Sequence, residues 1–193
     1  VGVGPYVAGG LGATILDPGI AGLSSEVFFS FSVGAGYLWP LSRNVALRAE
    51  ARGYVTWITR EGVQIDRIAC SWLIRRFIDP AAVIRFVPGK GYMPKPGELR
   101  FDMYEGEITH EGDRCSFEVL LTRAALTDSS LQAIAEIIHD IDLKDGKFGR
   151  EETTGIASLI TGICSATAQD DERIVRGSLV LDNLYQYFRA RRS

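Results

Sequence analysis

The chain has 193 residues, of which 46% are hydrophobic and 23% are charged, so its composition is that of a globular protein with one large or two small domains. A net charge of −3 argues against a broad nucleic-acid-binding surface, and no segment has the ~20 consecutive apolar residues of a membrane-spanning helix. Cys70, Cys115 and Cys164 lie far apart without a C-x-x-C pair, which argues against a disulfide framework or zinc knuckle and indicates reduced thiols.

Residues 1–56 differ from the rest of the chain, since they carry ten of the 21 glycines and only six charged residues. Three β-strands are predicted over residues 5–15, 26–38 and 45–57, and the middle one alternates large apolar with small residues at a period of two. We therefore expect a three-stranded antiparallel β meander before a second domain.

The strands of this first segment resemble a fragment of an outer-membrane β-barrel protein, a class that would place a complete barrel in the outer membrane. Three strands are too few to close a barrel, for which about eight are needed. We favour a truncated barrel-like segment fused to an unrelated domain, with the junction near residues 56–59. The alternative is a meander whose apolar face is covered by the second domain.

Residues 57–193 are predicted to form an α+β domain, mostly helical with a small β-sheet. Asp79-Pro80 ends the first helix, and Ser116 and Asp128 can cap the second and third. Helices are predicted over residues 65–78, 117–124, 131–141, 151–163 and 171–189, and strands over residues 83–87, 99–103 and 107–110.

The first of these helices carries charged residues among its apolar positions. At 100° per residue, Asp66 and Arg76 fall among the apolar residues, whereas Arg67 and Arg75 fall on the opposite side, toward water. A charge on an apolar face must be paired or bound to a ligand, because leaving it bare costs several kcal/mol. The helix is therefore expected either to hold an internal ion pair or to line a polar pocket.

The two histidines, His110 and His139, each lie among acidic residues. With Asp142 and Glu118 they could bind a divalent transition metal as cofactor. Their spacing matches no local metal-binding signature such as H-E-x-x-H. The alternative, which we favour, is that both histidines are helix-end groups satisfied by hydrogen bonds or water.

Five segments together resemble the C-terminal domain of the chromate-resistance protein ChrB. They are WITREGVQIDRIACSWLIRRFIDP at 57–80, FDM at 101–103, ITHEGDRCSFE at 108–118, IIHDIDLKD at 137–145 and LDNLY at 181–185. The resemblance covers about residues 57–193 and implies a cytoplasmic domain that senses an oxyanion or metal within a chromate-responsive regulator. The separate DNA-binding part that precedes this domain in the family has no counterpart here, so no nucleic-acid contact is expected.

The implied partner is chromate or a sulfate-like oxyanion, a tetrahedral dianion that guanidinium groups bind with paired donors. We expect Arg76 to be the best ligand, in a pocket with Asp66, His110, His139 and Asp142. The full set of predicted ligand-binding residues is Asp66, Arg67, Trp72, Arg75, Arg76 and Asp102.

Each of these residues also has a simpler interpretation. Arg76 is equally well explained by an ion pair with Asp66, Asp102 or Asp142, and Trp72 by burial in the core. The alternative function is that of a metal-dependent enzyme, for instance in redox detoxification, that uses the two histidines and nearby carboxylates.

Overall fold

The computed structural model describes the backbone of residues 4–16, 26–40, 46–52 and 55–191, and the side chains of residues 55–191. Three strands pair antiparallel in chain order near the N-terminus: β1 (Gly4–Leu16), β2 (Glu26–Pro40) and β3 (Ala46–Arg52). The barrel-like alternation predicted for residues 1–56 depends on side chains outside the described residues, so it stays a prediction.

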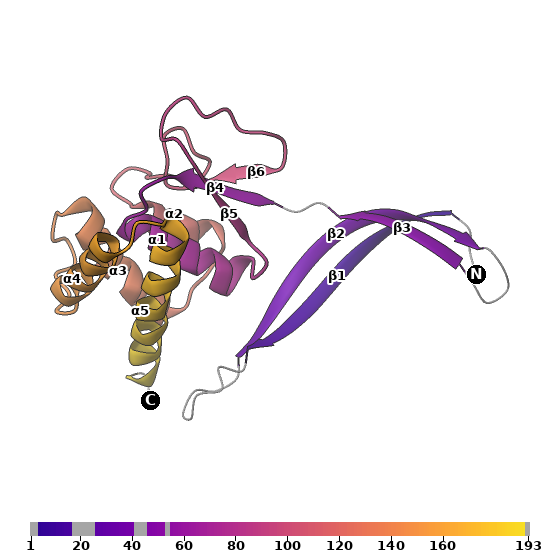
Figure 1. The fold of residues 1–193 in the computed structure, drawn as a ribbon. Helices are drawn as coiled ribbons and strands as arrows, with labels where there is room; N and C mark the ends of the chain where they lie inside the picture. Colours follow the sequence, from indigo (N-terminus) through magenta and orange to yellow (C-terminus); the bar gives the residue numbers. More distant parts are fainter. Residues whose placement is uncertain (1–3, 17–25, 41–45, 53–54, 192–193) are drawn as a thin grey trace.

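A separate, parallel sheet begins the second part of the chain (Figure 1). Its central strand is β4 (Thr56–Arg60), flanked by β5 (Val83–Val87) and β6 (Glu98–Arg100). The expectation that residues 45–57 form one strand is therefore wrong, because β3 ends at Arg52 and β4 belongs to another sheet. The strand predicted over residues 107–110 is reduced to a single bridge between Phe101 and Ile108.

The prediction of a mostly helical domain with a small sheet is confirmed in residues 55–191. The α-helices there are α1 (Ile65–Leu73), α2 (Ser116–Arg123), α3 (Ser129–Leu143), α4 (Thr153–Ala166) and α5 (Asp170–Ala190). Within the described parts of the chain, no helix combines the length and the apolar character needed to cross a membrane.

Helix α1 lies at the centre of this domain, where α2, α3 and α5 pack around it (Figure 1). Every residue of α1 is buried, including Asp66 and Arg67. The prediction that Arg67 faces water is therefore wrong, because it assumed a helix with one side in solvent. The helix continues as a single π-helical stretch, η1 (Ile74–Ile78), and ends before Pro80 as predicted.

The caps of α2 and α3 agree only in part with the sequence. Asp128 caps α3 as predicted, since its carboxylate accepts N–H hydrogen bonds from Ser130 and Leu131 at 2.6 and 3.3 Å. The N-cap of α2 is Cys115 rather than Ser116, and its N–H donates to Glu118 at 2.8 Å. The hydroxyl of Ser116 is thereby left for another acceptor.

The turn between β4 and α1 is held by groups from distant parts of the chain. The N–H groups of Gly62 and Val63 each donate to the carboxylate of Asp170, at the start of α5, at 2.8 Å. Arg67 donates to the carbonyl oxygen of Gly62 at 2.7 Å. Gly62 has a φ of 70°, which glycine adopts without a steric cost. These bonds fix where α1 starts, and with it the position of Asp66 and Arg67.

Candidate functional site

A cavity of about 350 Å³ is lined by the start of α1, the end of α3, the middle of α4 and the segment after β6. This volume is at the lower end of the range of small-molecule sites, roughly 300–1,000 Å³. Part of the wall is apolar, and the remainder carries charges of both signs. The polar residues that line it are Arg60, Gln64, Asp66, Arg67, Asp102, His110, Asp142, Lys144 and Thr161.

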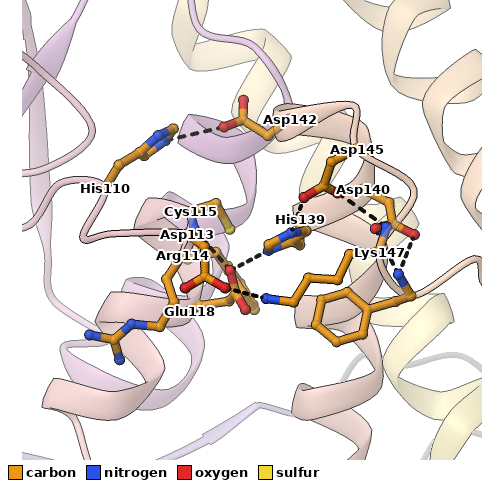
Figure 2. A network of polar contacts seen from close by, with 12 residues as sticks. His110, Asp113, Arg114, Cys115, Glu118, His139, Asp140, Asp142, Asp145 and Lys147 are labelled. Carbon is orange, nitrogen blue, oxygen red and sulfur yellow. Dashed lines mark hydrogen bonds and ion pairs between the residues drawn. The ribbon is translucent and has the colours of Figure 1, made fainter.

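Three carboxylates converge on one nitrogen of His110. Its Nε2 lies 3.1 Å from Asp142 Oδ2, 3.4 Å from Asp66 Oδ2 and 3.6 Å from Asp102 Oδ1. Figure 2 shows His110 and Asp142 facing one another from separate segments of the chain. The hydrogen bond to Asp66 raises the pKa of His110, and the charges of all three carboxylates add to this effect although burial opposes it.

Asp66 is the most buried of these carboxylates, with 2% of its side chain exposed. It accepts hydrogen bonds from the N–H groups of Ser116 and Phe117, at 3.0 and 3.1 Å, where the N-terminus of α2 points at it. Burial raises the pKa of Asp66 to about 6, since the contact with His110 offsets it only in part. The α2 N-terminus therefore fixes the orientation of a carboxylate in the interior.

Asp102 joins the loop after β6 to α1 and α2. Its carboxylate accepts a hydrogen bond from Ser116 Oγ at 2.8 Å and pairs with Arg67 Nη1 at 3.2 Å. Asp102 has a φ of 44°, a left-handed conformation that aspartate tolerates better than most residues and that recurs at functional sites. The residue is thus held by both its backbone and its side chain.

Arg67 is a buried cation in the cavity wall, with 5% of its side chain exposed. Its two terminal nitrogens are used by Asp102 and by the Gly62 carbonyl. Its Nε is buried without a hydrogen-bond partner among the described residues. Burial lowers the pKa of Arg67 and Asp102 counteracts this, and arginine stays charged at any physiological pH. Arg67 therefore places a charged guanidinium in the cavity wall, with one N–H that no described residue accepts.

His139 lies between Glu118 and Asp145 in a second set of polar contacts (Figure 2), and it does not line the cavity. Its side chain is fully buried; Nδ1 lies 2.7 Å from Glu118 Oε2, and Nε2 lies 3.2 Å from Asp145 Oδ2. Burial alone would lower the pKa of His139, but these two hydrogen bonds raise it. Because the same Glu118 oxygen accepts the N–H of Cys115, His139 links the start of α2 to the segment after α3.

The predicted pocket is therefore assembled in part. Asp66, His110 and Asp142 come together as predicted, and Asp102 and Arg67 join them. The predicted metal set of His110, His139, Asp142 and Glu118 is divided between two networks, because His139 and Glu118 contact each other and not His110.

Three further predicted ligands lie outside the cavity. Arg76 pairs with Asp182 of α5 at 3.2 Å, not with any of the carboxylates predicted for it. Trp72 is core, and its Nε1 donates to the same Asp182 at 2.8 Å. Arg75 lies beside Arg76 in η1 and does not line the cavity. A π-helix has more residues per turn than an α-helix, so a periodicity of 100° per residue misplaces Arg76.

Sequence reasoning missed the contribution of α4 and of Ser116. Helix α4 has no charged residue, and it supplies Ala157, Ile160 and Thr161 to the cavity wall. The spacing of these three places them on one face, which was the available signal. Ser116 positions two carboxylates at once, through its N–H and its hydroxyl, and no local pattern indicates that.

Comparison with known proteins gives two matches over this part of the chain. The family model of the ChrB C-terminal domain matches residues 57–188. Protein ChrB of Cupriavidus metallidurans is 38% identical over 133 residues, which are 68% of this chain and 40% of that relative. The chain thus spans less than half the length of the relative it matches. No solved structure matches the chain.

Proposed function

This chain belongs to the ChrB C-terminal domain family, and we propose that it acts in chromate resistance as the oxyanion-sensing part of a chromate-responsive regulator. The observation that carries the proposal is the buried guanidinium of Arg67 in the wall of a cavity of small-molecule size, with Nε unpartnered among the described residues. Chromate and sulfate offer the acceptor oxygens that such a donor needs.

Two more cationic side chains in the cavity wall favour an anion beside Arg67. Arg60 and Lys144 also line the cavity, so three cationic side chains surround the same space. Arg67 itself is 5% exposed, and burial of this kind strengthens an arginine–oxyanion pair relative to the same pair in water. A bound oxyanion would touch α1, the segment after β6 and the end of α3, and could thereby couple binding to the packing around α1.

The proposal is tested by equilibrium dialysis of the full chain against chromate and sulfate. Arg67→Lys keeps the charge and removes the Nε donor, so we expect affinity to fall about tenfold or more, as loss of a hydrogen bond to a charged group implies. Arg75→Lys is the matched control, since Arg75 does not line the cavity. Absence of oxyanion binding in the wild type, or equal affinity in Arg67→Lys, would overturn the proposal.

A metal-dependent enzyme is the second candidate, favoured by the three carboxylates around His110. The cavity would then be the place where a bound oxyanion reacts, rather than a site whose occupancy is sensed. Incubation of the full chain with chromate, a divalent metal and a supplied thiol or nicotinamide reductant separates the two. If more than one equivalent of chromate is consumed and His110→Gln abolishes this loss, the domain is an enzyme and the sensor proposal is wrong.

A further inference from the structure

We propose that the cavity holds one divalent cation, bound by His110 Nε2 and by carboxylate oxygens of Asp66 and Asp102, with Asp142 beside it, and that this cation receives the oxyanion. The cation site stands on geometry alone, and its role as the oxyanion receptor rests on the proposed function. The remainder of the predicted metal set, His139 and Glu118, takes no part in it.

The convergence on His110 is explained poorly by hydrogen bonding. An imidazole Nε2 carries at most one proton, yet three carboxylate oxygens lie 3.1, 3.4 and 3.6 Å from it. Two ligands that are each about 2.1 Å from one ion lie about 3.0–3.4 Å apart at octahedral or tetrahedral angles. The three ligand atoms of His110, Asp66 and Asp102 also lie within 4.8 Å of one another. The separations to Asp142 and Asp66 fall in this range and the one to Asp102 is slightly longer, so the convergence fits a shared cation better than a single proton.

Both anchoring carboxylates are oriented by a second layer of donors. Asp66 is held by the N–H groups of Ser116 and Phe117, and Asp102 by Ser116 Oγ and Arg67. Outer hydrogen bonds of this kind fix the ligands of metal sites and are costly to remove. Ser116 donates a hydrogen bond to each carboxylate, so one residue at the start of α2 fixes their positions relative to each other.

The donor set selects the class of ion. It contains one imidazole and carboxylate oxygens but no thiolate, a mixture that suits Mn²⁺, Fe²⁺ or Zn²⁺ rather than a soft ion such as Cu⁺. With His110 40% exposed, the site keeps an open side toward solvent. Three protein ligands and an open position are typical of sites that bind an additional ligand rather than of closed structural sites.

A cation here also removes an obstacle to oxyanion binding. Asp66, Asp102 and Asp142 face the same space that the dianion would enter, and like charges in a low dielectric repel strongly. A divalent ion between these carboxylates reverses the local sign and adds a direct ligand for an oxyanion oxygen. The oxyanion would then lie between the cation and the guanidinium of Arg67 in the cavity wall.

The test is calorimetric titration of Mn²⁺ and Zn²⁺ into the full chain after treatment with a chelator. We expect one equivalent to bind, and His110→Gln and Asp102→Asn each to weaken binding at least tenfold. The matched control is Asp113→Asn, which removes an exposed carboxylate whose partner is Lys147, and it should bind like the wild type. Urea unfolding of each variant separates a lost site from a lost fold.

The outcomes separate this inference from the proposed function. No binding of either ion, or loss of binding in His139→Gln but not in His110→Gln, would overturn the cation site. Chromate binding that is equally tight with and without chelator would overturn the receptor role and leave the proposed function standing. Stoichiometric, His110-dependent cation binding without any affinity for chromate or sulfate would support the site and contradict the proposed function.

Discussion

Gly177 of α5 permits the close approach of α5 to α1, and Gly177→Ala is expected to destabilise the protein. A Cβ at this position would overlap Cγ2 of Ile68, which is fully buried in α1, and would lie 3.5 Å from Cδ1 of Ile160. The displaced atoms belong to packed core, so the overlap cannot be relieved by turning a flexible side chain into solvent. Ile160 also lines the cavity, and a shift there would reach the site.

The magnitude follows from two opposing effects. Replacing glycine by alanine inside a helix favours folding by about 1 kcal/mol, whereas inserting a methyl group into a packed core costs about 1–3 kcal/mol. We therefore expect a net loss of about 0–2 kcal/mol in the free energy of unfolding. Gly162→Ala in α4 is the matched control, because a Cβ there meets nothing within 4 Å, and it should stabilise by about 0.5–1 kcal/mol.

Urea unfolding with linear extrapolation measures both variants. The difference between Gly177→Ala and Gly162→Ala isolates the steric cost, since the helix propensity gain is common to both. Ile68→Ala, which alone should cost about 2–5 kcal/mol, should cost less in the Gly177→Ala background, because the new methyl group then fills part of the space that the shorter side chain vacates. Equal stabilisation by the two alanines would refute the claim that Gly177 is needed for this packing.

Two further changes test the caps and the second polar network. Asp128→Ala should cost about 1–2 kcal/mol in unfolding free energy, because it removes the N-cap of α3 and a hydrogen bond from Tyr185, whereas Asp128→Asn should retain most of the stability. His139→Gln should be more destabilising near about pH 6 than near about pH 9. The raised pKa of His139 means that its contacts with Glu118 and Asp145 stabilise the fold fully below the unfolded pKa and lose this effect as pH rises through the folded pKa. Unfolding curves at both pH values check this, and a pH-independent loss would contradict it.

Much of the fold of residues 57–193 was predictable because local patterns and the packing agree. The apolar spacing in α3, the capping Asp128 and the stop at Asp79-Pro80 each act within a few residues of the element they define. The strand β4 was not predictable in the same way. Its short T-W-I-T-R sequence reads as the end of the preceding strand, and only pairing with β5 and β6, each more than twenty residues away, separates it.

The site was predictable where a charged residue occurs among apolar positions of a helix. Asp66 stood out as a charge on an apolar helix face, and it lies in the cavity wall. The same reasoning misplaced Arg67, because it could not show that α1 is enclosed on all sides. It also grouped His139 with Asp142, although a separation of three residues on α3 is enough to direct them toward different neighbours. Such contacts depend on tertiary packing, which composition and periodicity do not contain.

The bonds from Gly62 and Val63 to Asp170 have a consequence for the native-state dynamics of the domain. These two amide hydrogens are protected by a side chain more than a hundred residues away rather than by their own sheet. Their exchange with solvent deuterium therefore requires that the first turn of α5 detach, whereas exchange within β4 requires that the sheet itself open. Hydrogen exchange at Gly62 and Val63 thus reports the undocking of α5 separately from global unfolding. The measurement requires neither a substitution nor a ligand.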